Sequence, residues 1–251
     1  MIKSKFSHLL YLICFGLPTL NWSILEFMKL IFYYCTGNPN AFSNNYLMSF
    51  IILESIIFSL IIIKLTKAHK NLCYQFDFKF KLNLYTFINI ILLSIGLSLT
   101  LFFLIEHLFS ISTTTSNKYS IFVIILICLI SSISEEILYR GFILGYLRKN
   151  YSLKFSIFTQ ALIFSIFHFD IIQSMYTFIL GIILGITYTY TNSLIGVILM
   201  HIFFNIFVSF IMPYLSIKFY YSNIVLFILG IFLLIYSSIR IYKNKSYFYR
   251  S

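Results

Sequence analysis

The sequence has few charged residues and few prolines, and both shortages restrict the class of protein. Charged residues make up 10% of the 251 residues, whereas a soluble domain usually has about 25%. Hydrophobic residues make up 60%, and the mean hydropathy is +0.94. Only 3 prolines interrupt the long apolar runs, which are too long and too uniform for the alternating segments of about ten residues in a membrane β-barrel. The sequence therefore predicts an all-α integral membrane protein.

Acidic residues and patterned cysteines are also scarce. The 7 Asp and Glu face 18 Lys and Arg, which gives a formal net charge of +11. This excess lies in short loops and at the chain ends, so it indicates membrane orientation and not a nucleic-acid partner. Cys14, Cys35, Cys73 and Cys128 have no metal-ligand spacing, so they predict neither a disulfide framework nor a structural zinc site.

The apolar runs predict a bundle of about eight transmembrane helices, because about 20 residues cross the hydrocarbon core. The expected helices cover residues 8–35, 46–65, 82–109, 119–146, 154–170, 172–190, 193–212 and 222–240. Gly181 and Gly185 lie four residues apart in the sixth helix, which favours close packing against a neighbour.

The basic residues predict the orientation of this bundle. With the N-terminus inside, nearly all Lys and Arg outside the helices fall in the cytoplasmic segments 1–7, 64–81, 147–154, 190–192 and 240–251. Only Lys118 and Lys218 fall on the opposite side. Cytoplasmic loops carry an excess of Lys and Arg, so we expect both termini to be cytoplasmic and the protein to lie in the cell membrane.

The most unusual stretch, residues 134–140 (SEEILYR), follows a long apolar run. A charged side chain costs about 2.5–3.5 kcal/mol at the centre of a transmembrane helix. Glu136 and Arg140 lie one turn apart on the same helical face, which predicts a supporting ion pair. Glu135 points about 100° away from Glu136, so we expect it to be the working carboxylate.

Polar side chains also occur in two later apolar runs. His168 follows Phe164 by one helical turn, and His201 precedes Asn205 by one turn. A carboxylate and two imidazoles can activate water or hold a metal ion with an open coordination position, and an amide donor suits a developing oxyanion. These residue types favour an intramembrane hydrolase. A proton-coupled transporter and a structural polar network are also compatible with them.

Other charged residues in the apolar runs carry no predicted catalytic role. Glu26 and Lys29 lie one turn apart in the first helix and are expected to pair. Glu54 is a lone carboxylate in the second helix, and Glu106 and His107 end the third near the water interface.

Three motifs together resemble the CPBP family of intramembrane endopeptidases, which includes CAAX prenyl endopeptidases and bacteriocin-processing proteins and is also called the Abi group. The motifs are Glu135-Glu136-x-x-x-Arg140, Phe164-x-x-x-His168 and His201-x-x-x-Asn205. They occur in this order and at the expected places on the predicted helices.

The resemblance implies a role for each motif residue. Glu135 would activate water with assistance from His168. His201 and Asn205 would stabilise the oxyanion, and Glu136 and Arg140 would be supporting residues. The resemblance is compatible with a metal-free mechanism and equally with a divalent metal such as zinc. A metal would be held by Glu135, His168 and His201.

The resemblance also predicts the organisation of the chain and its partners. Residues 119–212 would form the catalytic core, 1–118 the accessory helices, and 213–251 the last helix and a basic tail. Expected substrates are membrane-associated proteins or peptides, such as leader-bearing bacteriocins or pheromones, that reach the site through a cytoplasmic opening. Two alternatives stay open: an immunity protein that binds without cleaving, and a small proton-coupled transporter.

Overall fold

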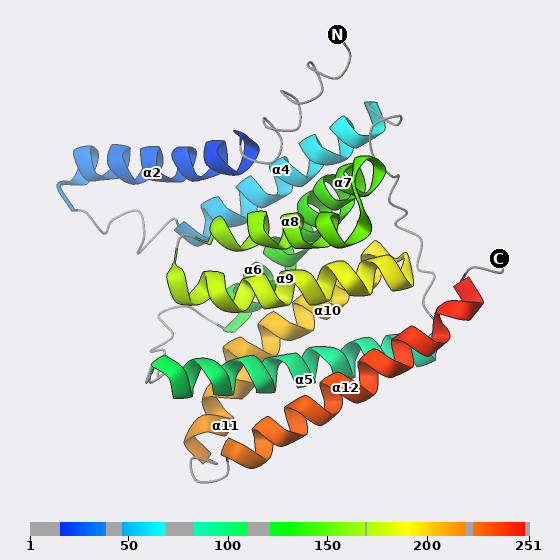
Figure 1. Cartoon of the computed structure of the whole chain (residues 1–251). Helices are drawn as coiled ribbons and strands as arrows, with labels where there is room; N and C mark the ends of the chain where they lie inside the picture. Colours follow the sequence, from blue (N-terminus) through cyan, green and yellow to red (C-terminus); the bar gives the residue numbers. More distant parts are fainter. Residues whose placement is uncertain are drawn as a thin grey trace.

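The computed structural model describes residues 16–38, 47–68, 83–109, 121–168, 170–218 and 223–248, and their regular structure is entirely helical (Figure 1). The longer helices are α2 (Leu17–Thr36), α4 (Leu47–Ala68), α5 (Leu84–Phe109), α6 (Ile121–Glu136), α8 (Leu153–Ile166), α9 (Ile171–Thr191), α10 (Leu194–Ile206) and α12 (Asn223–Phe248). The shorter ones are the π-helical turns η2 (Ile137–Leu144) and η3 (Phe207–Ile211), with α7 (Gly145–Asn150) and α11 (Met212–Lys218). The predicted all-α class is confirmed.

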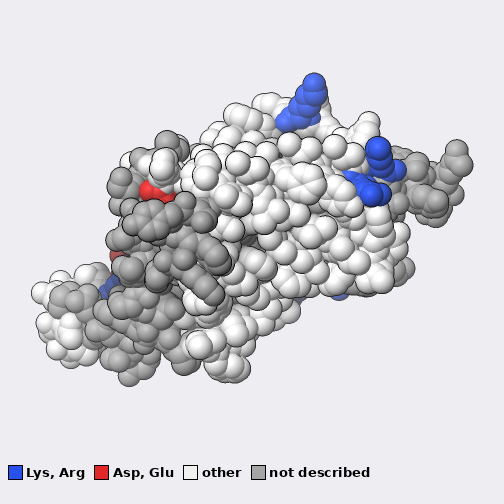
Figure 2. Space-filling view, turned by 90° about the horizontal axis from the view of Figure 1, so that it is seen from below, with Lys and Arg blue, Asp and Glu red and all other residues white. Residues whose placement is uncertain are grey.

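Within the described residues, 5 continuous helical segments are long and apolar enough to cross a membrane. They cover residues 84–107, 121–150, 171–191, 194–215 and 224–243. Many large apolar side chains point outwards from them, and Figure 2 shows a broad uncharged surface on one face. In lipid, backbone groups must be satisfied within the segment, so such apolar runs form helices. The chain is a multi-pass integral membrane protein.

The number of helices that cross the membrane stays a prediction, because three of the eight expected helices are not among these 5 segments. Helix α8 has 14 residues, which is about 21 Å against a hydrocarbon core of about 30 Å. In α4 the apolar segment covers only residues 51–61. Helix α2 is not among the 5 segments, and its described side chains are at least partly exposed. It contains the predicted Glu26–Lys29 pair, which is confirmed at 2.7 Å.

Glycines allow α8 and α9 to approach closely, as the sequence predicted. A Cβ atom on Gly181 would lie 3.0 Å from the Cβ of Ala161, and one on Gly185 would lie 2.9 Å from Nε2 of Gln160. Larger side chains at either position would force the two helices apart. This contact matters for the site because α8 carries Phe164.

A second glycine contact joins α5 to α12. A Cβ atom on Gly230 would lie 2.7 Å from Oγ1 and 3.0 Å from the backbone nitrogen of Thr100, and one on Gly96 would lie 2.8 Å from the backbone nitrogen of Leu234. Because backbone atoms stand at these distances, neither contact can be relieved by rotating a side chain.

A tight turn fixes the direction of α10 after α9. Asn192 adopts the left-handed conformation (φ 51°) and ends α9, a position where Asn is tolerated better than most residues. Ser193 then caps α10, because its hydroxyl accepts a hydrogen bond from the backbone N–H of Gly196 at 3.1 Å. Helix α10 carries His201 and Asn205, so this turn sets the position of both.

The helix ends divide into two groups in Figure 1. The end of α4, the start of α5, the α7–α8 turn, the α9–α10 turn and the end of α12 all lie on the right. We call this side the basic end, because its described side chains include Lys67, Arg148, Lys149, Lys154, Arg240 and Lys243. The opposite end, on the left, holds Glu106 at the end of α5 and Asp170 at the start of α9. The described helix ends that border the predicted cytoplasmic segments 64–81, 147–154, 190–192 and 240–251 thus share one side. Segment 1–7 lies outside the described residues, and the orientation itself stays a prediction.

The α5–α12 contact generates a test of packing. We expect Gly230→Ala to lower the free energy of unfolding by about 1–3 kcal/mol, because the added methyl group overpacks the interface against backbone. Unfolding by SDS titration of the protein in mixed micelles measures this change. Ser238→Ala, on the exposed side of the same helix, is the control and should change little. Equal stability of the two variants would contradict the contact.

Candidate active site

The charged motif lies where α6 passes into η2. All residues from Glu136 to Leu147 are buried, whereas Glu135 is only partly buried. The π-helical turn widens the backbone at this point, and such turns are frequent at functional sites. Two adjacent carboxylates therefore occupy different surroundings: Glu136 faces the protein interior, and Glu135 lies at the edge of the buried segment.

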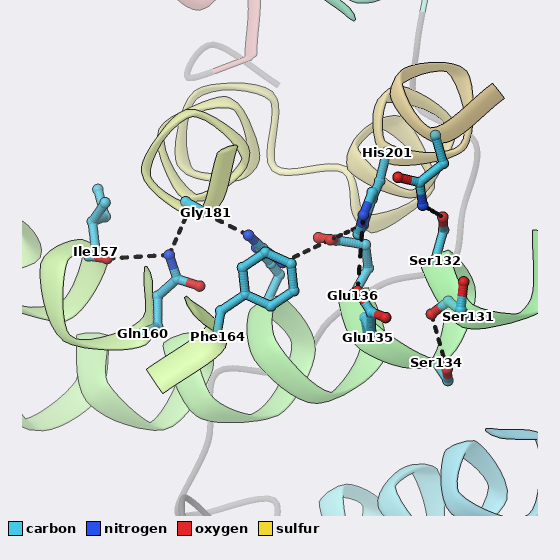
Figure 3. A network of polar contacts seen from close by, with 12 residues as sticks. Ser131, Ser132, Ser134, Glu135, Glu136, Ile157, Gln160, Phe164, Gly181 and His201 are labelled. Carbon is cyan, nitrogen blue, oxygen red and sulfur yellow. Dashed lines mark hydrogen bonds and ion pairs between the residues drawn. The ribbon is translucent and has the colours of Figure 1, made fainter. Parts of the chain in front are cut away.

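Glu136 is the centre of the polar cluster (Figure 3). Its Oε1 accepts a hydrogen bond from Nη1 of Arg140 at 2.6 Å and is 2.8 Å from Nδ1 of His201. The predicted Glu136–Arg140 ion pair is confirmed, and both side chains have 0% exposure. An ionised carboxylate only accepts, so Nδ1 of His201 carries the proton and donates it. This contact to His201 was not predicted.

The hydrogen bond to Glu136 determines what His201 offers at its other nitrogen. With the proton on Nδ1, a neutral His201 has its lone pair on Nε2. Nε2 lies 3.8 Å from Oε2 of Glu135, whose side chain is 31% exposed compared with 3% for His201. This distance exceeds a direct hydrogen bond and fits one water molecule that bonds both atoms. Glu135 and His201 are therefore placed to hold a water molecule between them.

A second group of contacts holds Arg140. Its Nη2 donates to the carbonyl oxygen of Gly181 at 3.3 Å, and Nε2 of Gln160 donates to the same oxygen at 2.8 Å. The guanidinium carbon also lies 4.7 Å from the centre of the Phe164 ring, which adds a cation–π attraction. Helices α8 and α9 thus fix the arginine that neutralises Glu136.

Phe164 separates the two histidines. Its ring centre lies 4.9 Å from that of His168 and 6.0 Å from that of His201, with both pairs nearly perpendicular. Nδ1 of His168 is 2.9 Å from the carbonyl oxygen of Phe164. The described contacts of the His168 side chain are therefore with Phe164, and no described contact supports the expected assistance to Glu135.

Asn205 is held by a residue that the sequence reasoning missed. Its Nδ2 donates to Oγ of Ser132 at 3.0 Å, and Ser132 has 0% exposure. The amide nitrogen carries two N–H groups, so this bond leaves the second for another acceptor. Ser132 precedes Glu136 by one helical turn, and this spacing is the signal that could have identified it.

Gln160 and Gly181 were also missed as parts of the site. Gln160 is a polar residue within an apolar run and has 0% exposure, which is a signal in the sequence because an unpaired amide is costly in such a place. Gly181 contributes only a backbone carbonyl, and Gly181 was expected to serve helix packing alone. No sequence pattern predicts that its carbonyl accepts two side chains.

The metal option was tested against the geometry. Among the residues that the structure describes, no three His, Cys, Asp or Glu side chains form a group that could hold a metal ion. The Nδ1 contacts of His201 to Glu136 and of His168 to the carbonyl oxygen of Phe164 leave Nε2 of both rings available, and metal-ligating histidines commonly make such contacts. In this arrangement Glu135, His168 and His201 do not form one group of three ligands, and the proposal below includes no step through a metal.

The fold and the cluster define a multi-pass helical membrane protein with a buried glutamate–arginine–histidine site. Residues 117–207 match the family model described as type II CAAX prenyl endopeptidase Rce1-like. This match covers less than half of the chain and confirms the resemblance predicted from the motifs, all three of which lie within these residues. No curated protein and no solved structure gave a match.

The buried ion pair generates a stability prediction. We expect Arg140→Met to lower the free energy of unfolding by about 3–5 kcal/mol, because it leaves Glu136 charged and unpaired in the interior. SDS titration measures the loss, and adding Glu136→Gln to Arg140→Met should recover part of it.

The chain offers a matched control for this test. Lys29→Met breaks the Glu26–Lys29 pair, which also joins a glutamate to a basic residue one helical turn away but has side chains that are 35% and 43% exposed. We expect this variant to lose no more than about 1 kcal/mol. Similar losses for Arg140→Met and Lys29→Met would contradict the role assigned to the buried pair.

Proposed function

We propose that this protein is an intramembrane endopeptidase that hydrolyses peptide bonds in membrane-associated proteins or peptides. The observation that carries the proposal is the partly exposed carboxylate of Glu135 opposite Nε2 of His201, at 3.8 Å. The family match supports it, because the matched family is a protease family. Leader peptides, peptide pheromones and bacteriocins are the substrates that we propose.

In the proposed reaction, Glu135 acts as the general base. It takes one proton from the water molecule, and the water oxygen attacks the carbonyl carbon of the scissile bond. His201 accepts a hydrogen bond from the same water through Nε2 and so orients it. The protonated Glu135 then gives its proton to the leaving nitrogen as the C–N bond breaks.

The negative charge on the carbonyl oxygen must be stabilised during the attack. Asn205 is the proposed donor, because one N–H of its amide is held by Ser132 and the other can bond the oxyanion. The oxyanion role that the resemblance implies for His201 would require a second proton on Nε2. The hydrogen bond from Nδ1 to Glu136 favours the orienting role.

The general-base role predicts a loss of activity without a loss of fold. We expect Glu135→Gln to reduce kcat for peptide cleavage by about 10²–10⁴-fold, because the amide keeps the shape of the side chain and removes the base. Purified protein in detergent, assayed against a peptide library by mass spectrometry, measures the change. A chelator arm tests whether cleavage needs a metal.

Glu106→Gln is the matched control for Glu135→Gln. Glu106 is also a partly buried carboxylate in an apolar helix, but it lies at the end of α5, so its loss should leave cleavage unchanged. Cleavage that survives Glu135→Gln would exclude the mechanism. Inert wild-type protein that still protects cells from a bacteriocin would favour the immunity alternative.

The proposed oxyanion role of Asn205 predicts that Asn205→Ala slows the chemical step of cleavage. We expect kcat to fall by about 10²–10³-fold with little change in KM, because the donor acts mainly in the transition state. Asn150→Ala is the control, since that amide lies at the exposed end of α7 and donates to the carbonyl oxygen of Tyr146. Proton-coupled flux in liposomes that Asn205→Ala leaves unchanged would favour the transporter alternative.

A further inference from the structure

Helix α10 carries His201 and Asn205, but its sequence does not select the face on which they meet the rest of the site. Apart from these two residues and Gly196, every residue of α10 is apolar. A helix that is apolar on several faces is suited to burial in several rotations, so its polar contacts have to fix one of them. Two such contacts, from His201 to Glu136 and from Asn205 to Ser132, join α10 to α6.

A third polar contact reaches α10 from α5. Oγ of Ser94 donates to the carbonyl oxygen of Met200 at 2.9 Å and lies 3.1 Å from the carbonyl oxygen of Ile90 in its own helix. A hydroxyl has one proton, and the contact between the helices is the shorter of the two. Ser94 and Met200 both have 0% exposure, and a buried hydroxyl needs an acceptor. Met200 directly precedes His201, so α5 holds the backbone of α10 next to the histidine.

Helix α5 is itself held from the side of α12. In Figure 1, α5 lies beside α12 and crosses α10, and it packs against both. Gly96 faces α12, where an added Cβ atom would lie 2.8 Å from the backbone nitrogen of Leu234. Ser94 and Gly96 are two residues apart, which is a rotation of about 200° around the helix axis. They therefore serve opposite faces of α5, and Ser94 links a helix fixed by α12 to the helix that carries His201.

This link restricts the movements of α10 that would misplace the site. A shift of α10 along its axis by one residue is about 1.5 Å, which would lengthen and misalign the 2.9 Å hydrogen bond from Ser94. The same shift would change the 3.8 Å separation of Nε2 of His201 and Oε2 of Glu135, which fits the proposed water molecule. Misplacement by about 1 Å at a reacting centre can lower the rate by about 10²-fold.

We infer that Ser94 is a positioning residue of the active site and that α5 is part of the scaffold of this site. Ser94 acts indirectly, through the backbone of α10, on the placement of His201 and Asn205. Helix α5 precedes residues 117–207, which match the family model, so the inference extends the site beyond the matched residues. Its consequence for peptide cleavage rests on the proposed function.

Ser94→Ala tests the inference, and Ser98→Ala is the matched control. Ser98 also has 0% exposure and lies one turn further along α5, but its hydroxyl donates within the same helix, to the carbonyl oxygen of Ser94 at 2.8 Å. We expect Ser94→Ala to lower kcat for peptide cleavage by about 10-fold with KM unchanged, because α10 supplies groups that act in the chemical step. We expect Ser98→Ala to keep kcat within about twofold of wild type, and both variants to be equally stable in SDS titration.

A second measurement needs no activity. In full-length protein with ¹⁵N-labelled histidine rings, NMR observes Nδ1 of His201, and the signal that is missing from His201→Asn assigns it. This nitrogen is bonded to Glu136 at 2.8 Å. We expect Ser94→Ala to shift the signal, because this hydrogen bond changes when α10 moves, and Ser98→Ala to leave it in place.

Three results would overturn the inference. An unshifted His201 signal in Ser94→Ala would show that α10 keeps its position without the bond. A kcat of Ser94→Ala within about twofold of wild type would show that cleavage does not depend on it. Equal effects of Ser94→Ala and Ser98→Ala on kcat would assign both serines to packing alone. Wild-type protein that cleaves no peptide would contradict the proposed function instead, and the NMR measurement would still decide whether Ser94 positions His201.

Discussion

The site depends on one oxygen atom, Oε1 of Glu136, which is shared by Arg140 at 2.6 Å and His201 at 2.8 Å. A charge with 0% exposure must be paired, because the cost of leaving it unpaired exceeds that of most other defects. The pairing ties η2 to α10 and fixes which nitrogen of His201 carries the proton. Without it, the Nε2 lone pair would have no defined direction.

Helix packing holds this interaction in place. The carbonyl group of Gly181 on α9 accepts hydrogen bonds from Arg140 and from Gln160 on α8. Gly181 can do this because it has no side chain, and a Cβ atom there would lie 3.0 Å from Ala161. One residue thus permits the close approach of α8 and α9 and also positions the arginine. Stability and site geometry share the same contact.

The neighbouring glutamates show how the bundle separates two roles. Glu136 is enclosed and neutralised by Arg140, whereas Glu135, one residue earlier, is 31% exposed and lies 3.8 Å from His201. The rotation of about 100° per residue directs the two side chains to different surroundings. An enclosed, paired carboxylate and a partly exposed one can therefore lie side by side at a depth where either alone would be costly.

The sequence by itself determined the all-helical membrane class, the Glu136–Arg140 pair and the ability of the Gly181 and Gly185 face to pack closely against a neighbour, because composition and i,i+4 spacing are local properties. Only the tertiary structure decided that His201 bonds Glu136, that Ser132 holds Asn205 and that His168 contacts Phe164. These depend on how each helix is rotated and packed against the others. Local periodicity does not specify that rotation, since several faces of a uniformly apolar helix are equally suited to burial.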